Sequence, residues 1–108
     1  MRATVDAVER ELQLPDGAVL RHEGDDYAGG NPWLISTLWL GLARRQAGDE
    51  TALQRAIEYT LARQTPLGLL PEQVTPRGDP ASVLPLGWSH AMLMVAARPE
   101  LALVRDGA

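Results

Sequence analysis

The chain has 108 residues and a net charge of −4, and it contains arginines but no lysine. That length suits one small domain, and dispersed arginines on an acidic protein argue against nucleic-acid binding. The lack of cysteine excludes disulfides and thiolate chemistry. No apolar run is long enough to cross a bilayer, and the charged N-terminus is no signal peptide. We therefore expect a soluble domain with no membrane partner, and a cytoplasmic location is favoured.

Four segments have the apolar pattern of helices. The first and third are apolar on one side only, as in helices that cover a core. The second and fourth are apolar around almost their whole circumference, so other elements must surround them, and Trp39 in the second is assigned to the core. The expected ranges are 4–13, 32–46, 50–63 and 88–98.

Two residues predict helix starts. Asn31 is a suitable N-cap because Pro32 follows it, and the missing N–H of proline does no harm at the first helical position. Asp49 is the second expected N-cap, directly after Gly48.

The connections between the helices differ in length. The turn at Ala47 and Gly48 is tight, whereas the loops over 14–30 and 65–86 are long, and long loops are usually functional. One-sided and all-apolar helices alternate, which predicts outer and inner helices of an all-α barrel with both long loops at one end. A tetratricopeptide-type solenoid is a weaker alternative, because the helices do not recur at a fixed short period.

Glu72 is the first candidate for chemistry. It lies in a loop between Pro71, which restricts the backbone, and Gln73, which places an amide beside the carboxylate. A general base needs a carboxylate held within hydrogen-bond reach of water. Taken alone, Glu72 is better interpreted as an exposed loop residue or as one that caps a nearby helix.

Polar and aromatic side chains in the flanking segments are typical of a sugar site. Arg21 and Asp25 could clamp sugar hydroxyls, or they could form a surface ion pair of little consequence. Tyr27, Trp33 and Trp88 could stack on a pyranose, or they could pack at helix starts.

Other reaction types find little support. Ser89 and His90 are adjacent without an acidic partner, so a nucleophilic triad is not expected and His90 is assigned a structural hydrogen bond near the site. The two histidines lack an acidic ligand set. We expect no metal and no cofactor.

Three segments, taken together and in order, resemble the C-terminal part of the catalytic domain of the glucoamylase family (glycoside hydrolase family 15). They are RHEGDDYAGGNPW at 21–33, PLGLLPEQV at 66–74 and PLGWSHAM at 85–92, and the resemblance extends over about 21–97. It implies an (α/α)6 barrel, of which the four helices would form about the last third. It also implies inverting, exo-acting hydrolysis of α-linked glucans.

The same resemblance assigns roles to residues. Glu72 matches the family's general base, and Arg21 and Asp25 match its sugar-contacting residues. The expected substrate-binding set is completed by Tyr27, Trp33, Gln73 and Trp88. His22 departs from the pattern, since many members carry an aromatic residue there.

Inverting hydrolysis needs a second carboxyl group, roughly 6.5–9.5 Å from the first. In the family this general acid lies upstream, in an element that no segment of this chain matches. We therefore expect 1–108 to be a C-terminal fragment that is inactive alone. Its partners would be an α-glucan or related oligosaccharide, and either the missing N-terminal part of the barrel or a second copy. The alternative is a non-catalytic helical module that binds glycans or a protein.

Overall fold

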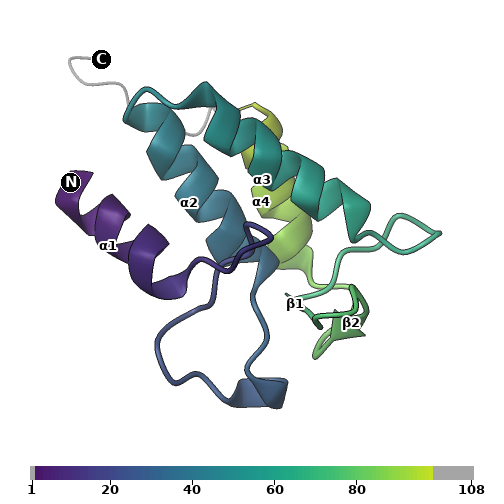
Figure 1. Ribbon diagram of the computed structural model, residues 1–108. Coiled ribbons are helices and arrows are strands. Elements are labelled where there is room, and N and C mark those ends of the chain that lie inside the picture. The colour runs from purple at the N-terminus through teal and green to yellow at the C-terminus, as the bar shows by residue number, and fades with distance from the viewer. Residues whose placement is uncertain (1, 99–108) are drawn as a thin grey trace.

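The computed structural model describes residues 2–98 of the chain, and within them the predicted all-α fold with four helices is confirmed. No helix of this region is both long and apolar enough to cross a membrane. The elements, labelled in Figure 1, are α1 (Arg2–Leu12), the 3-10 turn η1 (Tyr27–Gly29), α2 (Leu34–Gln46), α3 (Glu50–Ala62), β1 (Gln73–Val74), β2 (Pro80–Ala81) and α4 (Gly87–Ala97).

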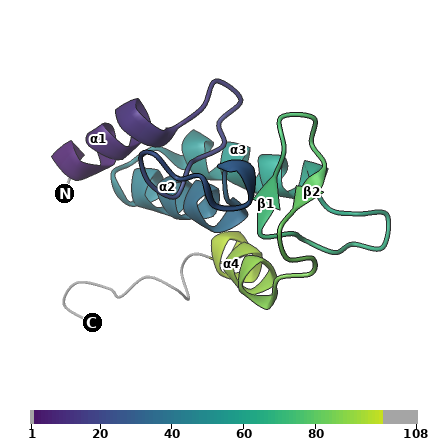
Figure 2. The same ribbon diagram turned by 90° about the horizontal axis from the view of Figure 1, so that it is seen from below.

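Helix α2 is the centre of the arrangement, because it contacts α1, α3 and α4 (Figure 2). Each of three small hydrophobic clusters contains one of its leucines: Leu34, Leu38 or Leu40. Burying side chains of this size stabilises the fold by about 1.5–3 kcal/mol each. The expected inner position of α2 is thereby explained, with α1 and α3 as its outer covers in a four-helix arc.

The second helix begins later than its sequence predicts. Trp33 has extended backbone angles (φ −106°, ψ 142°), and the helix starts at Leu34. Asn31 is therefore not the N-cap, and its side chain instead donates to the carbonyl oxygen of Ala28 at 3.0 Å. Strand-like pairing of Trp33 with Val19 and Gln73 accounts for the difference, because it keeps this residue out of the helix.

Two further expectations have opposite outcomes. Asp49 is the N-cap of α3, since its carboxylate accepts from the N–H of Ala52 at 3.0 Å. Trp39, by contrast, is not a core residue, because 48% of it is exposed. Its ring meets that of Trp88 of α4 edge-on at 5.6 Å, and it borders the hollow between α1 and α2, so neighbouring helices cover it only in part. An all-apolar helix therefore does not have all its faces buried in this arc.

Helices α2 and α3 meet closely at Gly41. A Cβ atom there would lie 2.8 Å from the Cβ of Ala56 and 3.2 Å from the Cα of Leu53. Both neighbours belong to the rigid part of α3, so only separation of the helices would relieve the contact.

Gly41→Ala should therefore destabilise the chain by about 1–3 kcal/mol, as overpacking does, although alanine favours helix formation. Gly87→Ala is the matched control, because Gly87 is also helical and has no atom near its Cβ position. Urea unfolding should show a lower midpoint for Gly41→Ala only. An equal effect of both substitutions would contradict close packing at Gly41.

Candidate functional site

Both long loops lie at one end of the helical arc, beside the first residues of α2 and α4 (Figure 1). The helices alternate in direction, so the loop after α1 and the loop after α3 return to the same end. All three segments that carry the family resemblance meet here.

A narrow line of antiparallel bridges connects the two loops. Gln13 pairs with Val19, Val19 with Trp33, Trp33 with Gln73, and Gln73 with Ala81. Single bridges have no sequence signature, so this feature could not be predicted from alternating hydrophobicity. It brings Trp33 from the first loop next to Gln73 of the second.

The backbone around Glu72 is held from several directions. The N–H of Glu72 donates to the carbonyl oxygen of Val83 at 2.9 Å, and its own carbonyl oxygen accepts from Leu34 N–H at 3.2 Å. Val74 N–H donates to Pro32 at 3.2 Å. Because buried backbone groups need such partners, the start of α2 and the end of the 65–86 loop together fix the position of this residue.

Helix α4 supports the same segment from its first turn. Leu86 N–H donates to the carbonyl oxygen of Leu70 at 3.0 Å, and Leu70 N–H donates to Nε2 of His90 at 3.0 Å. Ser89 Oγ donates to the carbonyl oxygen of Pro71 at 2.8 Å. The structural hydrogen bond expected of His90 is thus confirmed.

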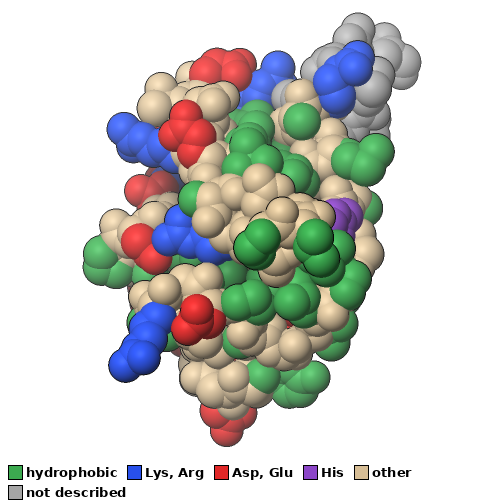
Figure 3. All heavy atoms as spheres, turned by 90° about the vertical axis from the view of Figure 1, so that its right-hand side faces the viewer, with side chains coloured by type: hydrophobic (Ala, Val, Ile, Leu, Met, Phe, Trp, Pro, Cys, Tyr) green, Lys and Arg blue, Asp and Glu red, His purple; other side chains and the backbone are tan. Residues whose placement is uncertain are grey.

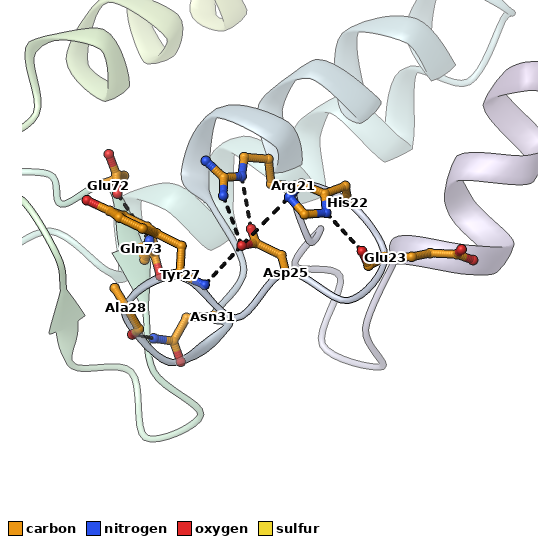
Figure 4. A network of polar contacts seen from close by, with 9 residues as sticks. All are labelled: Arg21, His22, Glu23, Asp25, Tyr27, Ala28, Asn31, Glu72 and Gln73. Atoms are coloured by element: carbon orange, nitrogen blue, oxygen red, sulfur yellow. Dashed lines mark hydrogen bonds and ion pairs between the residues drawn. The ribbon is translucent and has the colours of Figure 1, made fainter.

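The carboxylate of Glu72 lies in a largely buried position. The residue is 8% exposed, and Gln73 beside it is fully buried. Gln73 donates its Nε2–H to Oε1 of Glu72 at 3.1 Å (Figure 4). Because an ionised carboxylate only accepts hydrogen bonds, this contact orients the amide of Gln73 with its nitrogen toward Glu72.

Two buried polar atoms in this part of the site have no hydrogen-bond partner among the described residues. They are Oε1 of Gln73, which accepts, and Nε1 of Trp33, which donates. Unpaired buried polar groups are costly and are found where water or a ligand completes a site. The two atoms belong to residues that form a backbone bridge.

Arg21 and Asp25 form a bidentate ion pair. Nε and Nη2 of Arg21 each donate to a carboxylate oxygen of Asp25 at 2.9 Å, and Tyr27 N–H donates to the same carboxylate at 3.1 Å. The Arg21 guanidinium is the largest cause of a lowered pKa for Asp25. The Asp25 side chain is 3% exposed and that of Arg21 is 41% exposed. Asp25 therefore holds the arginine, and the arginine is the partner that solvent or a ligand reaches.

Aromatic rings lie against this arginine. Its guanidinium is 4.6 Å from the ring centre of Trp33 and 5.5 Å from that of Tyr27, and the two rings are 6.5 Å apart. Tyr27 is 52% exposed on the turn η1, and Figure 4 shows its side chain directed toward the segment of Glu72 and Gln73. The turn needs Gly30 (φ 73°), where a Cβ would lie 2.5 Å from the Asp25 carbonyl oxygen.

Trp88 stands apart from this cluster. It is 51% exposed at the start of α4, and its recorded ring contact is with Trp39. It is connected to the Glu72 segment through the backbone, because Ser89 binds Pro71. Of the expected substrate-binding residues, Trp88 alone is separate from the others, and its ring contact is with Trp39, which was expected in the core.

Two cavities in the described part of the chain lie mainly outside this cluster, although Arg21 borders the second. One of about 560 Å³ is lined by α1, α2 and α3 and is rich in charged side chains. The other, of about 320 Å³, is an apolar hollow between α1 and α2. Within residues 2–98, no group of three or more acidic or histidine side chains could hold a metal ion.

The surface near the second loop is partly apolar. Figure 3 shows hydrophobic side chains at the centre and right of this face, with most charged side chains on the left. Exposed hydrophobic residues of the loop and the helices include Leu67, Val83, Leu84 and Met94.

Comparison with known proteins finds relatives among glycosidases, although no family model matches. An uncharacterized glycosyl hydrolase of Methanocaldococcus jannaschii is 35% identical over 88% of this chain and 18% of that protein. Isomaltose glucohydrolase of Kribbella flavida is 32% identical over 94% of this chain and 29% of that protein.

Solved structures agree with this. A glycosidase of known structure matches with a TM-score of 0.79 and 30% identity, over 96% of this chain and 31% of that one. A glutamate-to-alanine variant of a glycosidase in complex with glucose matches with the same TM-score and 29% identity. The chain therefore spans less than a third of the length of these relatives and is similar to part of a glycosidase.

The ion pair of Asp25 predicts an acid-sensitive loop. The pKa of Asp25 is lowered in the folded chain, so its stabilising contribution is fully present above its ordinary value of 3.8 and is lost as pH falls through the folded value. Asp25→Asn should therefore lower the urea midpoint at neutral pH, and its difference from the wild type should shrink below pH 3.8.

Asp26→Asn is the matched control, because Asp26 is exposed and makes no side-chain cap hydrogen bond. It should follow the wild type at every pH. A constant difference between Asp25→Asn and the wild type down to the acid end would contradict the ion-pair origin.

Proposed function

We propose that residues 1–108 form part of a glycosidase catalytic domain and that Glu72 is its general base. The observation that carries the proposal is the setting of Glu72: a nearly buried carboxylate, oriented by Gln73 and held through its backbone by Val83 and Leu34. Surface glutamates without a function rarely have all of these constraints, whereas a general base needs a fixed position.

In the proposed reaction Glu72 takes a proton from a water molecule. The resulting hydroxide equivalent attacks the anomeric carbon of the sugar as the glycosidic bond breaks, and the configuration at that carbon inverts. The leaving oxygen receives a proton from a second carboxyl group. We infer that this acid comes from outside residues 1–108, because the resemblance assigns it to an upstream element.

The neighbouring residues suit a hydroxylated ring. Arg21 offers its exposed guanidinium edge as a donor, and Asp25 keeps it in place. Tyr27 and Trp33 offer aromatic surface beside it, and sugars combine apolar faces with hydroxyl rims. Trp88 would contact a more distant part of the substrate.

The relatives support a glucose-containing substrate. One is named for isomaltose and a glucohydrolase activity, and one of the solved neighbours is described in complex with glucose. Together with the glucoamylase-type motifs, these names favour exo-acting release of glucose from an α-linked oligosaccharide. The choice among starch-type, dextran-type and trehalose linkages stays open.

Glu72→Gln tests the base role in a chimera in which this chain replaces the matching part of the isomaltose glucohydrolase. The amide keeps the shape of the carboxylate but takes no proton, so glucose release should fall about 10²–10⁴-fold. Glucose release is measured with isomaltose and maltooligosaccharides, and NMR of the first product should show the β-anomer.

Glu58→Gln is the control, because Glu58 is exposed on α3. A Glu72→Gln chimera that keeps its activity, or a product with retained configuration, would refute the proposed role. Glucose release by the 108-residue chain alone would show that it contains its own acid. If the chimera, which also contains the upstream acid, binds sugar but does not hydrolyse it, the result would favour a non-catalytic glycan-binding module.

The uncovered tryptophans suggest how the chain is completed. Trp39 and Trp88 expose about half of their surface on the inner helices, and Met94 of α4 is 71% exposed. Exposed apolar patches of this kind mark interaction sites. We propose that the rest of the barrel covers them in a longer protein, and that copies of the chain cover one another when it is alone.

Replacing both tryptophans by glutamine should therefore weaken self-association. Loss of two large apolar side chains from an interface corresponds to at least about a tenfold rise in the concentration needed for assembly. Sedimentation velocity across a concentration series measures this. Leu61→Gln, which changes a 44%-exposed residue of outer helix α3, should have no effect. A monomeric wild-type chain with a cooperative melt would contradict the proposal.

A further inference from the structure

The first turn of α4 holds the segment before Glu72 at two successive residues. Nε2 of His90 accepts from Leu70 N–H at 3.0 Å, and Ser89 Oγ donates to the carbonyl oxygen of Pro71 at 2.8 Å. We propose that Ser89 and His90 are positioning residues for the Glu72 carboxylate. This inference rests on the proposed role of Glu72 as the base.

The hydrogen bond to His90 determines the form of its ring. A backbone N–H can only donate, so Nε2 must present a lone pair and the ring proton must be on Nδ1. His90 therefore acts as a neutral acceptor at a fixed reach from α4. Any side chain that replaces it must offer an acceptor at the same distance from the helix.

Ser89 completes the attachment at the next residue. Pro71 has no N–H, so its carbonyl oxygen is the only backbone group through which a hydrogen bond can hold it. The hydroxyl of Ser89, which is fully buried, donates that hydrogen bond. Without the hydroxyl this buried carbonyl would lose its recorded partner. The bonds at Leu70 and Pro71 lie two residues and one residue before Glu72, respectively, so a shift there moves the carboxylate directly.

These contacts matter because a base must be placed accurately. A displacement of about 1 Å can reduce a rate about 10²-fold. Two other attachments of this segment, from Val83 and Leu34, act at Glu72 itself. The contacts from α4 act on the two residues before Glu72, so they fix the direction in which the chain enters the site. Both contacts come from the segment in which Trp88, Ser89 and His90 are consecutive.

Substitutions at His90 separate positioning from general stabilisation. The Oε1 of glutamine reaches about as far from the backbone as Nε2 of histidine, whereas asparagine is too short. His90→Gln should therefore keep the hydrogen bond and His90→Asn should lose it. Ala91→Asn is the matched control, because it introduces the same residue at the next, exposed position of α4.

Two measurements are made on the 108-residue chain. Amide hydrogen exchange of the peptide containing Leu70 and Glu72 should be about fivefold faster in His90→Asn and in Ser89→Ala, as expected for loss of one hydrogen bond. The carboxyl ¹³C signal of Glu72 should shift in both variants. His90→Gln and Ala91→Asn should match the wild type in both measurements.

Unchanged exchange and an unchanged Glu72 signal in His90→Asn and Ser89→Ala would overturn the proposal, as would His90→Gln behaving like His90→Asn. If His90→Asn unfolds the chain, Ser89→Ala, which removes a single hydroxyl, decides the result. These readouts are independent of turnover. Failure of the base role in the chimera would therefore be distinguishable from failure of this positioning role.

Discussion

The site depends on the hydrogen bonds that attach residues 70–74 to three other parts of the chain. This segment has no regular secondary structure of its own beyond a two-residue strand, so it cannot satisfy its backbone groups internally. The start of α2, the end of the 65–86 loop and the first turn of α4 supply the partners instead. Backbone groups buried without partners would cost about 1–3 kcal/mol each, so the segment is stable only where all three meet.

This dependence explains why the inner helices begin where they do. Helix α2 starts only after Trp33 has paired with Val19 and Gln73, and the N–H of Leu34 is then free to bind the carbonyl oxygen of Glu72. Helix α4 starts at Gly87, which brings Ser89 and His90 against the same segment. The first N–H groups of a helix have no partner within the helix, and the carbonyl groups of this loop have few within the loop. Hydrogen bonds between the two therefore satisfy both.

The helices could be predicted from the sequence because their signals are local. Apolar periodicity indicated all four helices, and Asp49 capped α3 as expected from its position before Glu50. The failures are non-local. Asn31 looked like an N-cap, but pairing of Trp33 with residues far along the chain moved the helix start. Trp39 was expected to be buried, but its ring packs edge-on against Trp88 and 48% of it stays exposed.

The candidate site could be predicted in part. The motifs indicated Glu72, Arg21 and Asp25. The different roles of the two carboxylates could not be predicted, because they depend on which groups each one contacts in the folded chain. Both oxygens of Asp25 are used by Arg21 and its side chain is nearly buried, so the aspartate acts on the arginine rather than presenting a free carboxylate. Glu72 has no cationic partner recorded within residues 2–98 and is bound instead by a neutral amide. That contrast separates the two carboxylates physically: Asp25 is committed to its ion pair, and Glu72 keeps an oxygen with no recorded partner in the described chain.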